Sequence, residues 1–153
     1  MFPAFCEVKR IIMSGQLGRL TSIGYIEGNT FGWPSSTNFY VDHRVSSKGV
    51  LLDIGAHALD TICWWLGSKP KLVSYEDDSF GGPESFVTIK AELAGCDIEI
   101  ILNRLCELDN TYKIIGERGI IEGNITEYDR LSIKFNDKSV FKEIKVRKPK
   151  KST

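Results

Sequence analysis

The second half of this chain is a series of short segments in which apolar and polar residues alternate, separated by short turns. The clearest example contains Val87, Ile89 and Ala91, which alternate with the polar residues between them. A period of two is typical of a strand with one buried and one wetter face. Strands joined by short turns pair antiparallel, because a parallel pair needs a long crossover connection. The pattern therefore predicts a largely antiparallel sheet.

We expect eight strands, each bounded by residues that favour turns. They cover residues 19–30, 71–79, 85–94, 97–106, 111–115, 119–123, 130–135 and 139–146. Two of the connections, Ala94-Gly95-Cys96-Asp97 and Asn136-Asp137-Lys138, have the composition of hairpin turns.

Two amphipathic helices are expected in the first half of the chain. The first spans residues 3–14, with a proline at its start, where proline is favoured. The second spans residues 54–66 and ends at a glycine. Its predicted buried positions are Ile54, Ala58, Ile62 and Leu66. The elements together predict an α+β fold, a largely antiparallel open β-sheet with the helices packed on one face.

Length and composition indicate a single domain. The chain has 153 residues, of which 42% are apolar and 26% charged, as in an ordinary folded domain. We expect residues 1–146 to form this domain and the basic tail, residues 147–153, to be disordered.

Twenty basic residues balance twenty acidic ones, so no overall electrostatic field favours binding to nucleic acid or to an anionic membrane.

The spacing of the cysteines and the length of the apolar runs exclude several other classes of protein. The four cysteines lie far apart in the sequence, without the close pairs of a zinc site or a redox dithiol. No apolar run is long enough for a transmembrane helix, and the N-terminus lacks the apolar region of a secretory signal. We therefore expect reduced thiols and a cytoplasmic location.

Asp53 and His57 are the residues that most favour chemistry. They are four residues apart near the start of the second helix, so they share one helix face. A carboxylate beside an imidazole orients it and sets its proton affinity, which suits acid–base work on alcohols and ketones. Two structural alternatives stay open: Asp53 as a helix N-cap, and His57 as a half-buried surface histidine. A metal site that adds His43 lacks close ligand spacing, and no metal is expected.

A long stretch without hydrophobic periodicity precedes this pair. It is rich in Gly, Pro, Ser and aromatic residues, and such loops often cover or line a site. The predicted substrate contacts in it are Trp33, Asn38 and Arg44. The alternative, that its aromatic residues anchor the loop to the core, stays open.

Three motifs in this order resemble the C-terminal domain of the glucose-fructose oxidoreductase / inositol dehydrogenase / MocA-like (Gfo/Idh/MocA) family. The most specific is the central one, formed by Gly49, Leu51, Leu52, Asp53, Gly55 and His57. The outer two are the turn of Ser14, Gly15, Leu17 and Gly18 and the segment IIGERGIIEG that ends at Gly123. One departure is Lys48, where the family has a second glycine. The resemblance implies a fold like the C-terminal domain of dihydrodipicolinate reductase.

The sequence lacks the elements with which the resembled family binds its cofactor. It contains no G-x-G-x-x-G turn, which admits a dinucleotide pyrophosphate at a helix N-terminus. It also lacks the Glu-Lys-Pro element that supplies the family's catalytic lysine. The resemblance thus implies the substrate-binding and oligomerisation half of an NAD(P)-dependent oxidoreductase that acts on the CH–OH group of a sugar, polyol or related compound. NAD or NADP would be bound mainly by an absent domain, and the isolated chain is expected to be inactive.

In that family His57 would remove the hydroxyl proton and Asp53 would orient the imidazole. The open sheet face would form a homodimer or a tetramer.

Three alternatives stay open for the chain as a whole. It is a fragment of a sugar or polyol dehydrogenase, a free-standing and non-catalytic oligomerisation or sugar-binding domain, or one subunit of a site that a separate Rossmann domain completes in trans.

Overall fold

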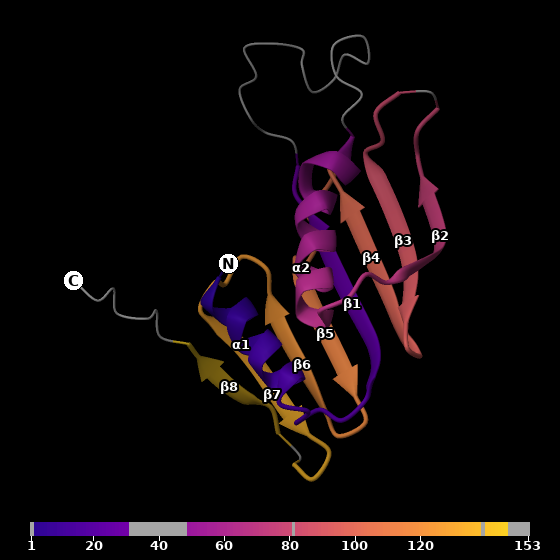
Figure 1. Ribbon diagram of the computed structural model, residues 1–153. Helices are drawn as coiled ribbons and strands as arrows, with labels where there is room; N and C mark the ends of the chain where they lie inside the picture. The colour runs from indigo at the N-terminus through magenta and orange to yellow at the C-terminus, as the bar shows by residue number, and fades with distance from the viewer. Residues whose placement is uncertain (1, 31–48, 81, 139, 147–153) are drawn as a thin grey trace, which may run out of the picture.

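One sheet with two helices on one of its faces makes up the computed structural model, which describes residues 2–30, 49–80, 82–138 and 140–146 (Figure 1). The strands are β1 (Leu20–Gly28), β2 (Lys71–Asp77), β3 (Phe86–Leu93), β4 (Cys96–Asn103), β5 (Thr111–Gly116), β6 (Gly119–Asn124), β7 (Arg130–Phe135) and β8 (Lys142–Lys145). The helices are α1 (Pro3–Met13) and α2 (Ala56–Leu66), and a π-helical turn, η2 (Leu51–Gly55), precedes α2. The predicted α+β fold is confirmed. Within the described ranges, no helix has the length and apolar content needed to cross a bilayer.

The order of the strands decides where the site lies. The sheet runs β2-β3-β4-β1-β5-β6-β7-β8, and all neighbours are antiparallel except β1 and β4, which are parallel. In this parallel pair Gly28 lies opposite Asn103. The carboxyl ends of β1 and β4 therefore meet at one edge of the sheet, next to η2 (Figure 1). The turn pattern predicted antiparallel pairs between consecutive strands but neither contact of β1, because β1 is far in sequence from both β4 and β5.

The core fills the space between the helices and one sheet face. At its centre the ring of Trp65 packs on Phe5 of α1 and Tyr112 of β5, with ring centroids 5.3 and 5.2 Å away. The Trp65 indole N–H donates to the Phe5 carbonyl at 3.1 Å. These contacts fix α2 on both α1 and the sheet, so the position of the site helix follows from core packing.

The buried face of α2 differs in part from the prediction. Ala58 and Ile62 are buried as expected, but Trp65 takes the next buried position while Ile54 and Leu66 are only partly buried. Ile54 lies in the π-helical turn, whose wider winding shifts the phase of the side chains relative to α2.

The site helix is capped by a residue from another part of the chain. The N–H of Leu51 donates to the Glu84 carboxylate at 2.9 Å, and the N–H of Val50 donates to the Glu84 carbonyl at 2.9 Å. A carboxylate at this end also complements the helix dipole. Gly49 leaves room for it, because a Cβ at Gly49 would collide with the Glu84 carboxyl group. The interpretation of Asp53 as the N-cap is therefore wrong: η2 has no side-chain cap of its own, and Asp53 lies inside the turn.

Replacing Glu84 by alanine is expected to lower the free energy of unfolding by about 1 kcal/mol, the usual value of a lost helix cap. Urea denaturation followed by circular dichroism measures this change. Glu107→Ala is the matched control, since Glu107 is an exposed loop residue outside the helices and strands. Equal stability of the Glu84→Ala and Glu107→Ala variants would show that the cap does not stabilise η2.

Candidate functional site

A cavity of about 350 Å³ lies where the carboxyl ends of β1 and β4 meet the start of the site helix. Its lining residues are Asn29, Thr30, Val50, Asp53, Ile54, His57, Asn103 and Arg104. The volume is within the range of small-molecule sites, about 300–1,000 Å³. The structure thus brings both predicted catalytic residues, Asp53 and His57, into one cavity. The predicted substrate contacts Trp33, Asn38 and Arg44 lie outside the described residues.

Asp53 is held by an arginine that the sequence did not identify. Its Oδ2 atom lies 2.6 Å from Nη2 of Arg104, which directly follows β4. The Arg104 side chain is only 12% exposed, whereas that of Asp53 is 42% exposed. The backbone N–H of Arg104 donates to the Ser85 carbonyl at 2.9 Å. Arg104 therefore links the site helix to the end of β4 and offsets the charge of Asp53.

His57 lies in the first turn of α2 and is exposed to the cavity. No hydrogen bond joins it to Asp53 in the part of the chain that the structure describes. The Asp53 carboxylate is turned to Arg104 instead. Among the described residues the imidazole has no hydrogen-bond partner, and it faces the cavity.

A second carboxyl group approaches the site from beneath the helix. Glu27 follows the buried Ile23 and Tyr25 at intervals of two along β1, so its side chain is on the same, helix-covered face. It is half-buried, and the Tyr25 hydroxyl donates to its Oε2 atom at 3.0 Å. Burial raises the pKa of Glu27; the Tyr25 hydrogen bond and His57 partly oppose this rise, and Asp53 adds to it.

Burial raises the pKa of Tyr25 as well, with a further contribution from the Glu27 charge. The hydroxyl therefore stays protonated and serves as a donor to Glu27. Sequence reasoning missed Glu27 and Arg104 for one reason. Glu27 is the last residue but one of β1 and Arg104 directly follows β4, and only the parallel pairing of these strands brings both to the helix.

No group of side chains in the described part of the chain is arranged to hold a metal ion. Cys6, Cys63, Cys96 and Cys106 are all free thiols. Burial raises the pKa of the Cys96 thiol to about 11, so this group is a neutral core residue rather than a nucleophile.

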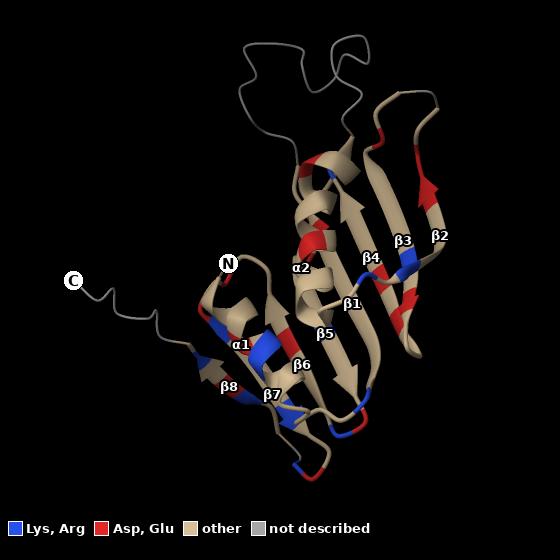
Figure 2. Cartoon of the chain, in the orientation of Figure 1, with Lys and Arg blue, Asp and Glu red and all other residues tan. Residues whose placement is uncertain are grey.

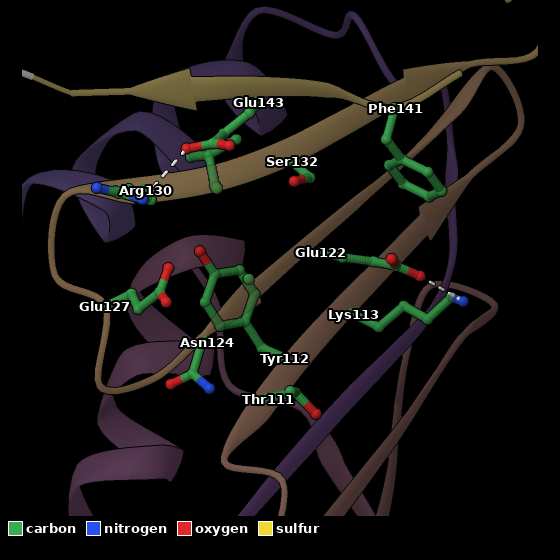
Figure 3. Close-up of a pocket in the computed structure, with 12 residues that line it drawn as sticks. Thr111, Tyr112, Lys113, Glu122, Asn124, Glu127, Arg130, Ser132, Phe141 and Glu143 are labelled. Carbon is green, nitrogen blue, oxygen red and sulfur yellow. Dashed lines mark ion pairs between the residues drawn. The ribbon is translucent and has the colours of Figure 1, made fainter. Parts of the chain in front are cut away.

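A larger cavity, of about 730 Å³, lies over β5 to β8 (Figure 3). Two ion pairs cross the strands in its lining, Lys113 with Glu122 at 2.6 Å and Arg130 with Glu143 at 3.6 Å, and Glu127 lines it as well. Figure 2 shows that charges of both signs are spread along the sheet, while acidic residues lie on the first turns of the site helix. Most charges of the larger cavity are thus paired with one another, whereas the smaller cavity gathers groups suited to proton transfer.

Comparison with protein families matches residues 5–122 to the GFO/IDH/MocA C-terminal domain. Among curated proteins, a Bacillus subtilis (strain 168) protein, YteT, which is named as an oxidoreductase, is 31% identical over 87 residues. That alignment covers 54% of this chain and 20% of YteT.

Solved structures share the fold at low sequence identity. An aldose-aldose oxidoreductase from Caulobacter crescentus, complexed with glycerol, matches with a TM-score of 0.82 at 19% identity, over 97% of this chain and 46% of that one. A levoglucosan dehydrogenase in complex with NADH and levoglucosan matches with a TM-score of 0.78 at 21% identity, over 94% and 44%. This chain spans less than half the length of each of these relatives. The matched region covers most of the sequence, and the chain belongs to the GFO/IDH/MocA family, whose C-terminal domain it represents.

Proposed function

We propose that this chain is the substrate-binding and oligomerisation half of an NAD(P)-dependent oxidoreductase that acts on the CH–OH group of a sugar, polyol or related compound. The observation that carries the proposal is the 350 Å³ cavity in which His57 stands beside the Asp53–Arg104 ion pair. Support comes from the two related structures, one titled as a complex with glycerol and the other as a complex with NADH and levoglucosan.

The chain's own residues supply proton transfer and recognition. His57 would accept the proton of a substrate hydroxyl, since histidine is the side chain that most often acts as a general base and this one faces the cavity. Arg104 and Asp53 would orient neighbouring hydroxyl groups, because together they offer N–H donors and a carboxylate acceptor. Asn29 and Asn103 add amides of the kind that fix polar ligands in such pockets.

The residues present do not form a dinucleotide site. The sequence has no G-x-G-x-x-G turn and no Glu-Lys-Pro lysine. We therefore assign no reaction step on this chain to NAD or NADP, and the hydride acceptor would come from a Rossmann domain in cis or in trans.

The outer side of the site helix offers a surface for that domain. Leu52 and Leu59 are 57% and 37% exposed, and the exposed Ala56 lies between them at helical spacing. These three residues form an apolar stripe beside the exposed His57. A Rossmann domain seated on this stripe would cover the cavity and bring its cofactor over the site.

The open face of the sheet, opposite the helices, favours a second copy of this chain. At its centre is Gly24, between the cross-strand ion pairs Lys90–Glu99 at 3.9 Å and Lys113–Glu122 at 2.6 Å. A hollow of about 480 Å³ lies over this part of the sheet. Charges of both signs on one face allow two copies to pair in opposite orientation, which supports a homodimer or a tetramer.

The first test replaces His57 by glutamine in this chain combined with a Rossmann half. Turnover should fall about 10²- to 10⁴-fold, the usual contribution of a general base, while binding of the nicotinamide cofactor should stay unchanged. Asp60→Asn is the matched control, because Asp60 is exposed on the same helix. Turnover that is equal in the His57→Gln and Asp60→Asn variants would remove His57 from the chemistry.

The second test adds a side chain at Gly24. A Cβ there meets nothing within 4 Å, so Gly24→Gln should leave the fold of one copy intact while it obstructs the centre of the open face. Light scattering after gel filtration should show a smaller assembly for this variant. Gly82→Gln, at an equally open loop position, should keep the original mass. An unchanged mass in the Gly24→Gln variant would exclude this face as the interface.

A further inference from the structure

We infer that Asn110 is a positioning residue of the candidate site. It holds the carboxamide of Asn29 so that the NH₂ end of this group is turned to the cavity, where it donates a hydrogen bond to a hydroxyl oxygen of the ligand. The inference rests on the proposed function for the class of that ligand, a sugar or polyol. Asn110 acts from outside the cavity lining, through Asn29.

The Asn110 side chain is attached to the end of β1 by both of its polar atoms. Its Oδ1 atom accepts the backbone N–H of Gly28 at 3.0 Å, and its Nδ2 atom lies 3.3 Å from the Gly28 carbonyl oxygen. Nδ2 also donates to the Leu108 carbonyl at 3.0 Å, and the Leu108 N–H donates to the Gly28 carbonyl at 3.0 Å. Asn110 therefore fastens the loop before β5 to the last residue of β1.

The backbone at both ends of this contact is suited to it. Asn110 has a φ of 51°, in the left-handed region that asparagine adopts more readily than most residues. Its carbonyl accepts the N–H of Ile125 at 2.7 Å. Gly28 allows the loop to come close, because a Cβ there would collide with the Leu108 side chain. These contacts fix the point from which the Asn110 side chain reaches β1.

The same contacts decide the orientation of two carboxamides. In Asn110, the atom that faces a backbone N–H has to be the oxygen, and the atom that faces two backbone carbonyls has to be the nitrogen. This nitrogen lies 3.3 Å from the Asn29 side chain, so the atom of Asn29 that faces it is the acceptor Oδ1. The reverse orientation of Asn29 would place two donors against each other. The NH₂ end of Asn29 therefore points away from Asn110.

Asn29 lines the cavity together with Asp53 and His57. Its backbone N–H donates to the Asn103 carbonyl at 3.2 Å, which holds it beside the end of β4. An NH₂ group at this position complements the Asp53 carboxylate, since one donates and the other accepts. A hydroxyl group does both, so the two side chains together suit a ligand with several hydroxyl groups.

Asn103, the second asparagine of the cavity lining, has a different role. Its Oδ1 atom accepts the N–H of Leu105 at 2.7 Å, and its Nδ2 atom donates to Sγ of Cys106 at 3.2 Å. Both ends of its carboxamide thus stabilise the turn that follows β4. Of the two asparagines, Asn29 is the one that we assign to the ligand.

Nitrogen-15 NMR of the 153-residue chain tests the orientation of Asn29. The Asn29 carboxamide is assigned by the signal that is lost in Asn29→Ala. This signal should move in Asn110→Gly, because glycine tolerates the positive φ but lacks the donor. Asp109→Ser, at the exposed neighbouring position, should leave it in place. An Asn29 signal that stays unmoved in Asn110→Gly would overturn the inference.

A second variant guards against a wider disturbance of the fold. If the backbone amide spectrum of Asn110→Gly differs beyond the loop and the end of β1, Asn110→Asp takes its place. Aspartate keeps an acceptor for the Gly28 N–H but has no NH₂ group to hold the Asn29 oxygen. The Asn29 signal should move in this variant as well.

A double-mutant cycle separates positioning from a purely structural role. The probe is D-glucose, and its Kd is measured from the backbone amide shifts of Thr30 and Val50, which line the cavity. Asn29→Ala and Asn110→Gly should each weaken binding about 2- to 10-fold, the effect of one neutral hydrogen bond. The double variant should bind no more weakly than Asn29→Ala alone, because Asn110 acts only through Asn29. Asp109→Ser should bind like the unaltered chain.

Two results of this titration would overturn the inference. Additive losses in the double variant would mean that Asn110 acts through the fold and not through Asn29. An unaltered chain whose cavity amides do not shift with D-glucose would mean that the Asn29 NH₂ group is not presented to a polyhydroxy ligand.

These measurements need neither cofactor nor turnover, so the two proposals fail separately. A combined enzyme whose turnover does not depend on His57 would remove the proposed function, even where Asn110 orients Asn29. In an active combined enzyme, Asn110→Gly should raise KM with little change in kcat, because a contact made equally in the ground state and the transition state affects binding alone.

Discussion

The parallel pairing of β1 with β4 is the constraint on which the candidate site depends. Every other pair in the sheet is antiparallel, and strands that alternate in direction send successive carboxyl ends to opposite edges. This one parallel contact instead brings the ends of two central strands to the same edge. Glu27 arrives there from β1 and Arg104 from the end of β4, beneath the helix that carries Asp53 and His57. An antiparallel β1–β4 pair would separate these four side chains.

One ion pair and two hydrogen bonds then hold the acidic groups at and around the site. Arg104 binds Asp53 at 2.6 Å, Tyr25 donates to Glu27 at 3.0 Å, and Glu84 holds the start of the helix through Leu51. The contacts of Arg104 and Glu84 join segments that are distant in sequence, whereas Tyr25 and Glu27 are two residues apart on β1. Together they support a cavity that the exposed imidazole of His57 lines, and an imidazole is suited to accepting a proton from a bound alcohol.

Local patterns in the sequence predicted the elements well, because alternation and turn chemistry act over a few residues. The strand around Val87 and Ile89 and the helix from Pro3 lie where their patterns placed them. Asp53 and His57 were found because helical spacing is also local. Arg104 and Glu27 could not be found in this way, since their approach to the helix depends on strand order in the sheet, which tertiary packing decides. The same holds for the cap from Glu84, which excluded the alternative that Asp53 is the cap.

The central claim is that this chain supplies the substrate half of an oxidoreductase site and relies on a Rossmann domain for its cofactor. Calorimetric titration of the isolated chain with NAD(H) and NADP(H), at a protein concentration where it is oligomeric, tests that claim most directly. Neither cofactor should give a detectable heat of binding. Clear binding at micromolar concentrations would mean that these 153 residues contain a dinucleotide site of their own, and the division into two halves would be wrong.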